Sequence, residues 1–256
     1  MVNAAIVTTL LEYPGSPVHQ ALPDAFMRRI PLGIVMGLVI VAIVYSPWGK
    51  RSGAHINPAV TWMFYRLGKI SLRDALLYTV AQFLGGIAAA QAMEALLGDP
   101  FTHPAVKYAT TRPGEAGVGA AFGAEFTITF VLMLTALLFM SAKRLERHTG
   151  AICGVLIMLY LFFETPLSGM SLNPARSFGS ALAGNVWDGI WVYFVAPPLG
   201  ALLAAQVFVW IRRDNDACAK LDHSSKLACI FCDYRKKQLP HVPVEDPPHR
   251  SDHEPA

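Results

Sequence analysis

Five long apolar stretches dominate this sequence and decide what kind of fold it can adopt. They lie near residues 30–48, 75–97, 118–142, 150–167 and 187–211. A membrane-spanning helix needs about 20 mostly apolar residues, and each stretch reaches or approaches that length. Charged residues make up only 15% of the chain and hydrophobic residues 54%, whereas soluble domains carry roughly 25% charge. The composition therefore excludes a disordered chain, disfavours an ordinary soluble enzyme and predicts an all-α membrane protein.

Two further apolar stretches, near 57–67 and 173–183, are too short to cross a membrane alone. Non-spanning helices at membrane depth are tolerated where protein buries them or where they line a cavity. These stretches therefore predict two re-entrant half-helices.

Residues 1–29 begin with an apolar stretch that ends at Pro14 and Gly15. It is too short to span a membrane, and it lacks the basic start of a signal peptide. We interpret it as the second half of a spanning helix, followed by an outer loop. Met1 is then either an internal methionine of a longer reading frame or the start of a stunted first span, and we favour the first alternative.

The two halves of the chain contain matching motifs. The triplets are Asn57-Pro58-Ala59 and Asn173-Pro174-Ala175. About 24 residues after each triplet comes a second match, over 81–91 in one half and 196–206 in the other. An odd number of spans between the copies would invert one relative to the other, as in transport folds that bind their solute at the repeat interface.

Each triplet also has a local meaning. Asn is a favoured helix N-cap and Pro is favoured at the first helical position, so each triplet predicts a helix start. Two short helices that enter from opposite faces can meet end to end at the midplane. Their N-termini, together with the amides of Asn57 and Asn173, would offer donors and positive dipole ends to a passing water molecule.

Four stretches resemble the major intrinsic protein family, the aquaporins and glycerol facilitators, and among these the bacterial-type aquaporins. They read SGAHINPAV (52–60), AEFTITFVL (124–132), GMSLNPARSFGSAL (169–182) and WVYFVAPPLGA (191–201). The resemblance covers roughly 30–211. It implies an aquaporin-like inverted repeat with six spans and two half-helices, a pore in every subunit, a homotetramer and a bacterial inner membrane. It also implies a passive water channel that excludes ions and protons by the dipole barrier known for aquaporin-type pores.

The resemblance places Arg176 at the narrowest constriction of the pore. Counting from the triplets adds Met170, Leu161 and Met36, or Gly37 if the register slips, as the other filter positions. This filter is unusually apolar. Ser177 and Ala181 after the second triplet, and Tyr193 in the last span, resemble water channels more than glycerol channels. We therefore expect water, with glycerol or other small neutral solutes as the alternative.

Three titratable residues need separate interpretations. A membrane-embedded acid is a functional candidate by default, but the resemblance implies that Glu125 is structural and accepts hydrogen bonds from a re-entrant loop. Glu164 either reaches the membrane interface or faces the pore mouth and pairs with Arg176. His55 is interpreted as structural support, with pH gating as the alternative.

The polar tail over 212–256 is the least family-like part of the chain. Four potential zinc ligands, Cys218, His223, Cys229 and Cys232, lie within it, and four such ligands suffice for a closed zinc site. Metal binding is one interpretation, and solvated or redox-labile cysteines are the other. The excess of Lys and Arg on one set of connections predicts that the tail is cytoplasmic.

The remaining function classes are a non-conducting membrane scaffold with a metal-binding tail, an intramembrane enzyme and a coupled transporter. The sequence shows no nucleophile–base or His-Glu-x-x-His constellation at membrane depth, so we expect no enzyme and no resident cofactor beyond a zinc ion in the tail. Basic residues are not clustered on a soluble face, so nucleic acid is not expected as a partner.

Overall fold

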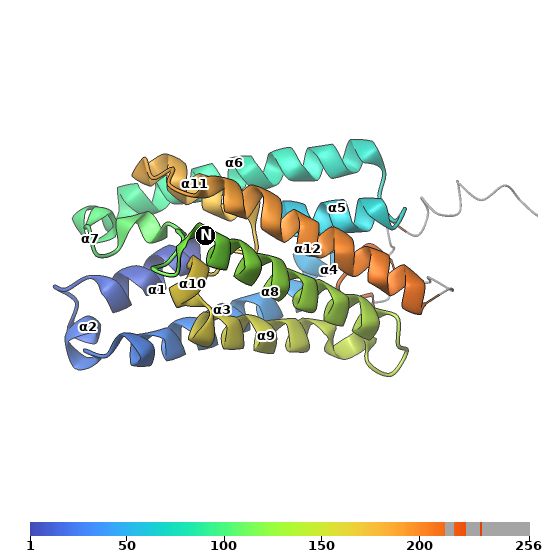
Figure 1. Cartoon of the computed structure of the whole chain (residues 1–256), viewed down its shortest axis with the longest axis horizontal. Coiled ribbons are helices and arrows are strands. Elements are labelled where there is room, and N and C mark those ends of the chain that lie inside the picture. Colours follow the sequence, from blue (N-terminus) through green and yellow to red (C-terminus); the bar gives the residue numbers. More distant parts are fainter. Residues whose placement is uncertain (213–217, 224–230, 232–256) are drawn as a thin grey trace, which may run out of the picture.

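A computed structural model describes residues 1–212, 218–223 and 231, and the secondary structure of this described part is entirely helical. Within the described residues, five helical segments are long and apolar enough to cross a membrane. Four are α3 (Ala25–Tyr45), α6 (Leu72–Leu97), α8 (Gly117–Met140) and α12 (Ile190–Ile211). The fifth, Glu146–Phe163, consists of a 3-10 turn continued by α9 (Thr149–Phe163). Figure 1 shows them side by side along the long axis of the molecule. The protein is an all-α integral membrane protein that crosses the bilayer several times.

Shorter helices connect and fill this bundle. They are α1 (Val2–Glu12), α2 (Pro17–Ala21), α4 (Pro47–Ser52), α5 (Pro58–Arg66), α7 (Asp99–Thr102), α10 (Thr165–Ser168) and α11 (Pro174–Gly184), with 3-10 turns at Lys107–Ala109 and Glu146–His148. α5 and α11 are the two helices opened by the triplets.

The bounds of α3 differ from the expected 30–48 because polar caps set its ends. Asp24 Oδ1 accepts a hydrogen bond from the backbone N–H of Met27 (2.8 Å), so the helix begins at Ala25 rather than at position 30. Ser46 Oγ accepts from the N–H of Gly49 (2.9 Å) and, with Pro47 behind it, starts α4 instead of continuing α3.

A similar break shortens the expected span 150–167. The long helix α9 ends at Phe163, and a separate short turn, α10, follows with Pro166 in its first turn. Proline lacks the N–H that would continue the helical ladder.

Glycines let pairs of helices approach closely. A Cβ on Gly37 of α3 would lie 2.6 Å from the Gly154 carbonyl of α9, and one on Gly200 of α12 would lie 2.5 Å from the Phe126 carbonyl of α8. The half-helix α11 meets α6 in the same way, because a Cβ on Gly86 would lie 2.6 Å from the Ala175 carbonyl. Small residues at membrane helix interfaces allow this backbone contact.

The glycine pair at 85 and 86 provides a matched test of this packing. We expect Gly86→Ala to destabilise the protein by about 1–3 kcal/mol, because the neighbouring backbone of α11 must move. A Cβ on Gly85 meets nothing within 4 Å, so Gly85→Ala should be neutral or slightly stabilising, as alanine is a better helix former. Thermal unfolding in detergent measures both variants, and equal melting temperatures would contradict the packing argument.

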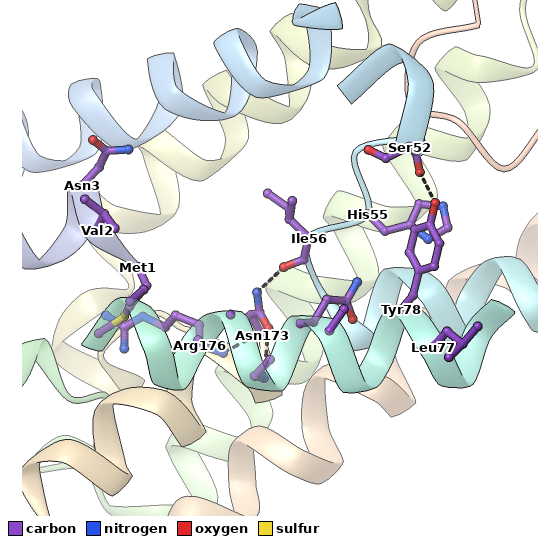
Figure 2. A pocket seen from close by; sticks show the side chains of 16 residues that line it. Met1, Val2, Asn3, Ser52, His55, Ile56, Leu77, Tyr78, Asn173 and Arg176 are labelled. Carbon is purple, nitrogen blue, oxygen red and sulfur yellow. Dashed lines mark hydrogen bonds between the residues drawn. The ribbon is translucent and has the colours of Figure 1, made fainter. Parts of the chain in front are cut away.

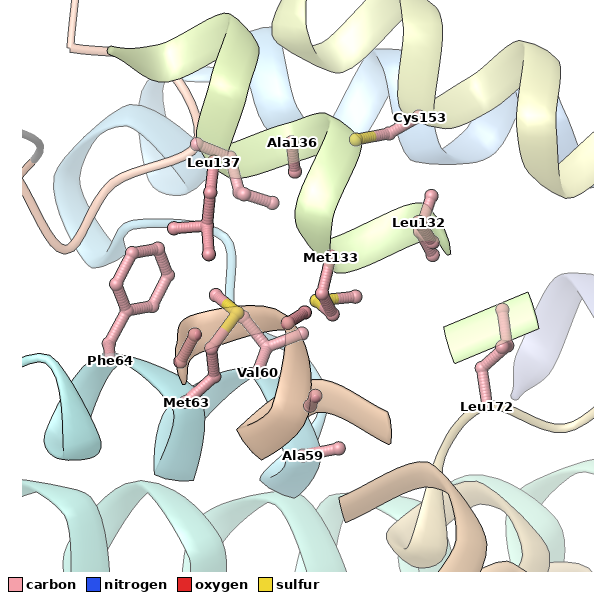
Figure 3. Close-up of a cluster of buried hydrophobic side chains, with 14 of the residues drawn as sticks. Ala59, Val60, Met63, Phe64, Leu132, Met133, Ala136, Leu137, Cys153 and Leu172 are labelled. Carbon is pink, nitrogen blue, oxygen red and sulfur yellow. The ribbon is translucent and has the colours of Figure 1, made fainter. Parts of the chain in front are cut away.

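The main apolar cluster anchors the first half-helix. Figure 3 shows Met63 and Phe64 of α5 facing Met133 and Leu137 of α8, and all four side chains are at most 5% exposed. α5 therefore has a fixed position inside the bundle, which in turn fixes the position of its N-terminus.

Candidate functional site

Each Asn-Pro-Ala triplet caps a half-helix. Asn57 Oδ1 accepts a hydrogen bond from the backbone N–H of Ala59 (2.9 Å) at the start of α5. Asn173 Oδ1 accepts from the N–H groups of Ala175 (3.1 Å) and Arg176 (3.3 Å) at the start of α11. Both side-chain carbonyls are therefore used by their own helix, as expected of an N-cap.

The amide nitrogens of the same two asparagines join the two halves of the protein. Asn57 Nδ2 donates to the carbonyl of Leu172 (2.7 Å), and Asn173 Nδ2 donates to the carbonyl of Ile56 (2.9 Å). Each asparagine thus binds the residue that precedes the other asparagine, which brings the two helix N-termini together. An amide NH2 group has two N–H donors, so one donor of each side chain is not used by these bonds.

The loops before the triplets share an unusual backbone. Positive φ angles occur at the same two offsets before each asparagine, at Ala54 (56°), Ile56 (41°), Met170 (51°) and Leu172 (59°). Such angles cost non-glycine residues roughly 1–2 kcal/mol each and persist where the surroundings enforce them. The repeat that is visible in the sequence is therefore also a repeat of backbone conformation.

Glu125 holds the second loop from the middle of α8. Its Oε1 accepts from Ser168 Oγ (2.7 Å) and from the N–H of Ser171 (2.6 Å), and its Oε2 accepts from the N–H of Leu172 (2.7 Å). The Glu125 side chain is fully buried. This is the contact that the resemblance implies, and it provides acceptors for two N–H groups of a backbone that forms no helix.

Ser177 and Tyr193, two of the three residues that resemble water channels, also contact this loop. Ser177 Oγ lies 2.5 Å from Ser171 Oγ and 2.7 Å from Thr111 Oγ1, and the Tyr193 hydroxyl donates to the carbonyl of Ser168 (2.5 Å). Sequence reasoning assigned no role to Thr111, Ser168 or Ser171, because their partners Ser177, Glu125 and Tyr193 become neighbours only in the fold. The structure thus gives the markers a physical role in fixing the shape of the loop.

His55 is buried beside the first triplet. Its Nδ1 lies 3.2 Å from Thr61 Oγ1, and Gln82 Nε2 donates a hydrogen bond to the same Thr61 oxygen (3.1 Å). Its Nε2 lies 3.1 Å from the carbonyl of Ala219 in the tail. With both ring nitrogens engaged and only 2% exposure, the geometry favours the structural interpretation over free titration.

A cavity of about 710 Å³ adjoins the junction of the half-helices. Ile56 and Asn173 lie at its middle, His55 toward one end, and Arg176 beside Met1 toward the other, as Figure 2 shows. The Arg176 atom Nη1 is buried without a hydrogen-bond partner within the described residues. A buried guanidinium N–H without a partner is a donor that can bind a solute.

The three apolar filter candidates lie in the adjoining core. Leu161 and Met170 are each 7% exposed and belong to the main apolar cluster, and Met36 packs against that cluster. They are not among the residues that line the cavity, whereas Arg176 is. Gly37, the alternative for the Met36 position, packs against the backbone of Gly154 in α9.

Glu164 is buried at the C-terminal end of α9. It is only 6% exposed, and its two carboxylate oxygens have no hydrogen-bond partner in the described part of the chain. No ion pair with Arg176 is found there either. Glu164 lies at the break between α9 and α10, where it is the last residue before α10 begins.

The expected zinc site is only partly visible. Cys229 and Cys232 lie outside the described residues. Among residues 1–212, 218–223 and 231, no group of three or more His, Cys, Asp or Glu side chains could hold a metal ion. Cys218 and His223 belong to a tail segment that contacts the loop before the first triplet, through Ala219 and Leu221.

Comparisons with known proteins agree with this architecture. The family profile described as "Major intrinsic protein" matches residues 5–208. Aquaporin NIP1-1 of Arabidopsis thaliana is 36% identical over 185 residues, 71% of this chain and 62% of that protein. Aquaporin NIP2-2 of Zea mays is 34% identical over 223 residues, 86% of this chain and 74% of that protein.

A solved structure supports the fold. The X-ray structure of the aquaglyceroporin from Plasmodium falciparum superposes with a TM-score of 0.66 and 22% identity, over 81% of this chain and 89% of that one. The chain matches less than two thirds of the length of the Arabidopsis relative. Because both curated relatives named here are plant proteins, the expected bacterial inner membrane finds no support in them.

Proposed function

This chain belongs to the major intrinsic protein family, and on that premise we propose that it is a passive channel for water. One observation carries the proposal: Asn57 and Asn173 bind each other's loops and so hold two helix N-termini together at a cavity. The relatives are named aquaporins, which are channels and not enzymes.

The geometry suggests how water is passed and ions are refused. Each helix N-terminus carries a partial positive charge of roughly half an elementary charge and several unpaired N–H donors. The N–H group that each asparagine amide does not use for the loop bonds can donate to a water oxygen. A water molecule between the two asparagines therefore points its oxygen at both helix ends. A hydrated cation meets the same two positive ends and is repelled.

The constriction is the second part of the proposal. We assign Arg176 as its polar side and Met36, Leu161 and Met170 as its apolar sides. An apolar wall offers no replacement for the hydration of an ion, so a charged solute would lose water there at high cost. The Arg176 atom Nη1, buried without a partner within the described residues, is the donor that a neutral solute can use.

Small neutral solutes such as glycerol are the second candidate cargo. The apolar character of the three side walls favours it, since carbon-bearing solutes pack against methionine and leucine. Ser177 and Tyr193, whose identities resemble those of water channels, favour water as the solute. Both bind the second loop beside the proposed constriction.

Stopped-flow light scattering from proteoliposomes tests the choice of solute. With the full chain reconstituted, we expect fast shrinkage in a sucrose gradient and slow re-swelling in a glycerol gradient, compared with empty vesicles. Fast re-swelling would show that the channel passes small neutral solutes such as glycerol, and would contradict selectivity for water. Shrinkage at the rate of empty vesicles would contradict an open channel in the full chain and favour the membrane scaffold.

Three structural expectations stay proposals alongside the channel. They are a channel domain over 30–211, a cytoplasmic tail over 212–256 and a homotetramer. Size-exclusion chromatography with multi-angle light scattering tests the tetramer, and protease access to the tail in sealed vesicles tests its sidedness.

A further inference from the structure

Residues 219–222 of the tail are buried although two of them are charged. Ala219 is fully buried, and Lys220 and Asp222 are each only 2% exposed. Charged side chains are almost never fully buried unless they are paired. A polar segment with this burial is docked on the rest of the protein and does not lie free beside it.

The docking surface is the loop before the first triplet, and backbone contacts define it. The N–H of Leu221 donates to the carbonyl of Gly53 (3.3 Å), and His55 Nε2 lies 3.1 Å from the carbonyl of Ala219. A Cβ on Gly53 would lie 2.4 Å from that same carbonyl. The tail therefore approaches the loop as closely as a glycine permits.

Side chains add an ion pair and ring contacts. Lys50 Nζ lies 3.4 Å from Asp222 Oδ2. Phe231 stacks on the His55 ring, with centroids 5.9 Å apart and planes 11° apart, and meets the edge of Tyr78 at 6.4 Å. The hydroxyl of Tyr78 in turn donates to the carbonyl of Ser52 (2.9 Å). Phe231 is only 5% exposed, so its side chain is buried against these residues.

These contacts lie at one end of the proposed solute path. Ser52, His55 and Tyr78 line the same cavity as Asn173 and Arg176, and Figure 2 shows them together at the end away from Arg176. The tail residues contact His55 and Tyr78 but are not themselves among the residues that line the cavity. Single substitutions can remove the ion pair or the ring contacts of this packing.

We propose that residues 218–223 and Phe231 form a cap that closes this mouth of the channel, and that the channel conducts fully only when the cap leaves the loop. The inference rests on the proposed function, because a cap regulates flux only if the cavity conducts. It assigns residues 218–223 and Phe231 to autoinhibition.

Point variants in the full chain test the cap. Phe231→Ala removes the ring contacts, and Asp222→Lys places two like charges side by side. Each should raise osmotic water flux by roughly three- to tenfold, the range expected when a closed state loses one stacking or ion-pair contact. The double variant Lys50→Asp with Asp222→Lys restores opposite charges and should return flux toward the wild-type rate.

Hydrogen–deuterium exchange supplies a readout that does not depend on flux. The peptide that contains Leu221 should be protected in the wild type and exchange faster in Phe231→Ala and Asp222→Lys. Unprotected exchange in the wild type would overturn the docking. Lost protection with unchanged flux would overturn the cap while leaving the channel intact. Water flux at the rate of empty vesicles in the wild type and in every variant would overturn the proposed function, and the regulatory role of the cap with it.

Discussion

Replacing Glu125 by leucine should abolish water flux and lower the free energy of unfolding by about 3 kcal/mol or more. The carboxylate accepts three hydrogen bonds, two of them from backbone N–H groups of the second loop. Each buried donor left without an acceptor costs about 1–3 kcal/mol. Without Glu125, the strained residues Met170 and Leu172 lose their restraint, and Asn173 loses its orientation.

A neighbouring threonine provides the control for this variant. Thr129 lies one turn further along α8, is fully buried, and its hydroxyl has no hydrogen-bond partner within the described residues. Thr129→Val keeps its shape and should leave stability unchanged or slightly higher. Thermal unfolding and stopped-flow shrinkage measure both variants. A Glu125→Leu protein that conducts and unfolds like Thr129→Val would show that the loop does not depend on the carboxylate.

Replacing Arg176 by valine should raise the permeability to glycerol and to small cations by at least about tenfold. The guanidinium is the polar donor of the proposed constriction, and a barrier lowered by only about 1.4 kcal/mol already changes a rate tenfold. Valine removes both the charge and the volume of the side chain. Water flux should persist, because the asparagine junction is untouched.

Arg176→Lys separates charge from shape. Lysine keeps the positive charge but lacks the planar fork of donors, so cation exclusion should survive while glycerol exclusion weakens. Glycerol re-swelling and cation-dependent fluorescence quenching in proteoliposomes measure the two effects. If Arg176→Val kept the wild-type selectivity for both solutes, Arg176 would have no place in the constriction.

The half-helices could be predicted from sequence because their start signals are local. Asn followed by Pro specifies a cap and a first turn with no help from distant residues. The cross-connections between the loops could not be predicted, because they join Asn57 to Leu172 and Asn173 to Ile56, more than a hundred residues apart. The repeat indicated that the two halves would meet, and only the structure shows which atoms do so.

Hydropathy does not reveal that α3 begins before Arg28 and Arg29, at the Asp24 cap. The expected apolar stretch begins at residue 30, directly after these two charged residues. In the structure Arg28 lies inside the helix and pairs with Glu12 of α1 (3.1 Å). An ion pair between two helices offsets the cost of burial, and no hydropathy profile contains it.

The tail shows a different limit of sequence reasoning. Its cysteines and histidine are residue types that can bind a metal ion, whereas the residues between them carry no such signal. The buried contacts belong to Ala219, Leu221 and Asp222. These residues carry no motif, and their partners lie at the far end of the sequence.

The most direct test of the central claim is thiol block at the junction of the half-helices. Ile56 lines the cavity and is 47% exposed, so Ile56→Cys should react with a methanethiosulfonate reagent. We predict that the modified protein conducts no more water than empty vesicles. The identically treated parent and a Leu84→Cys variant, whose new thiol lies at an exposed position of α6, should keep their flux. Complete modification of the thiol introduced at position 56 with unchanged water flux would contradict a path between Asn57 and Asn173.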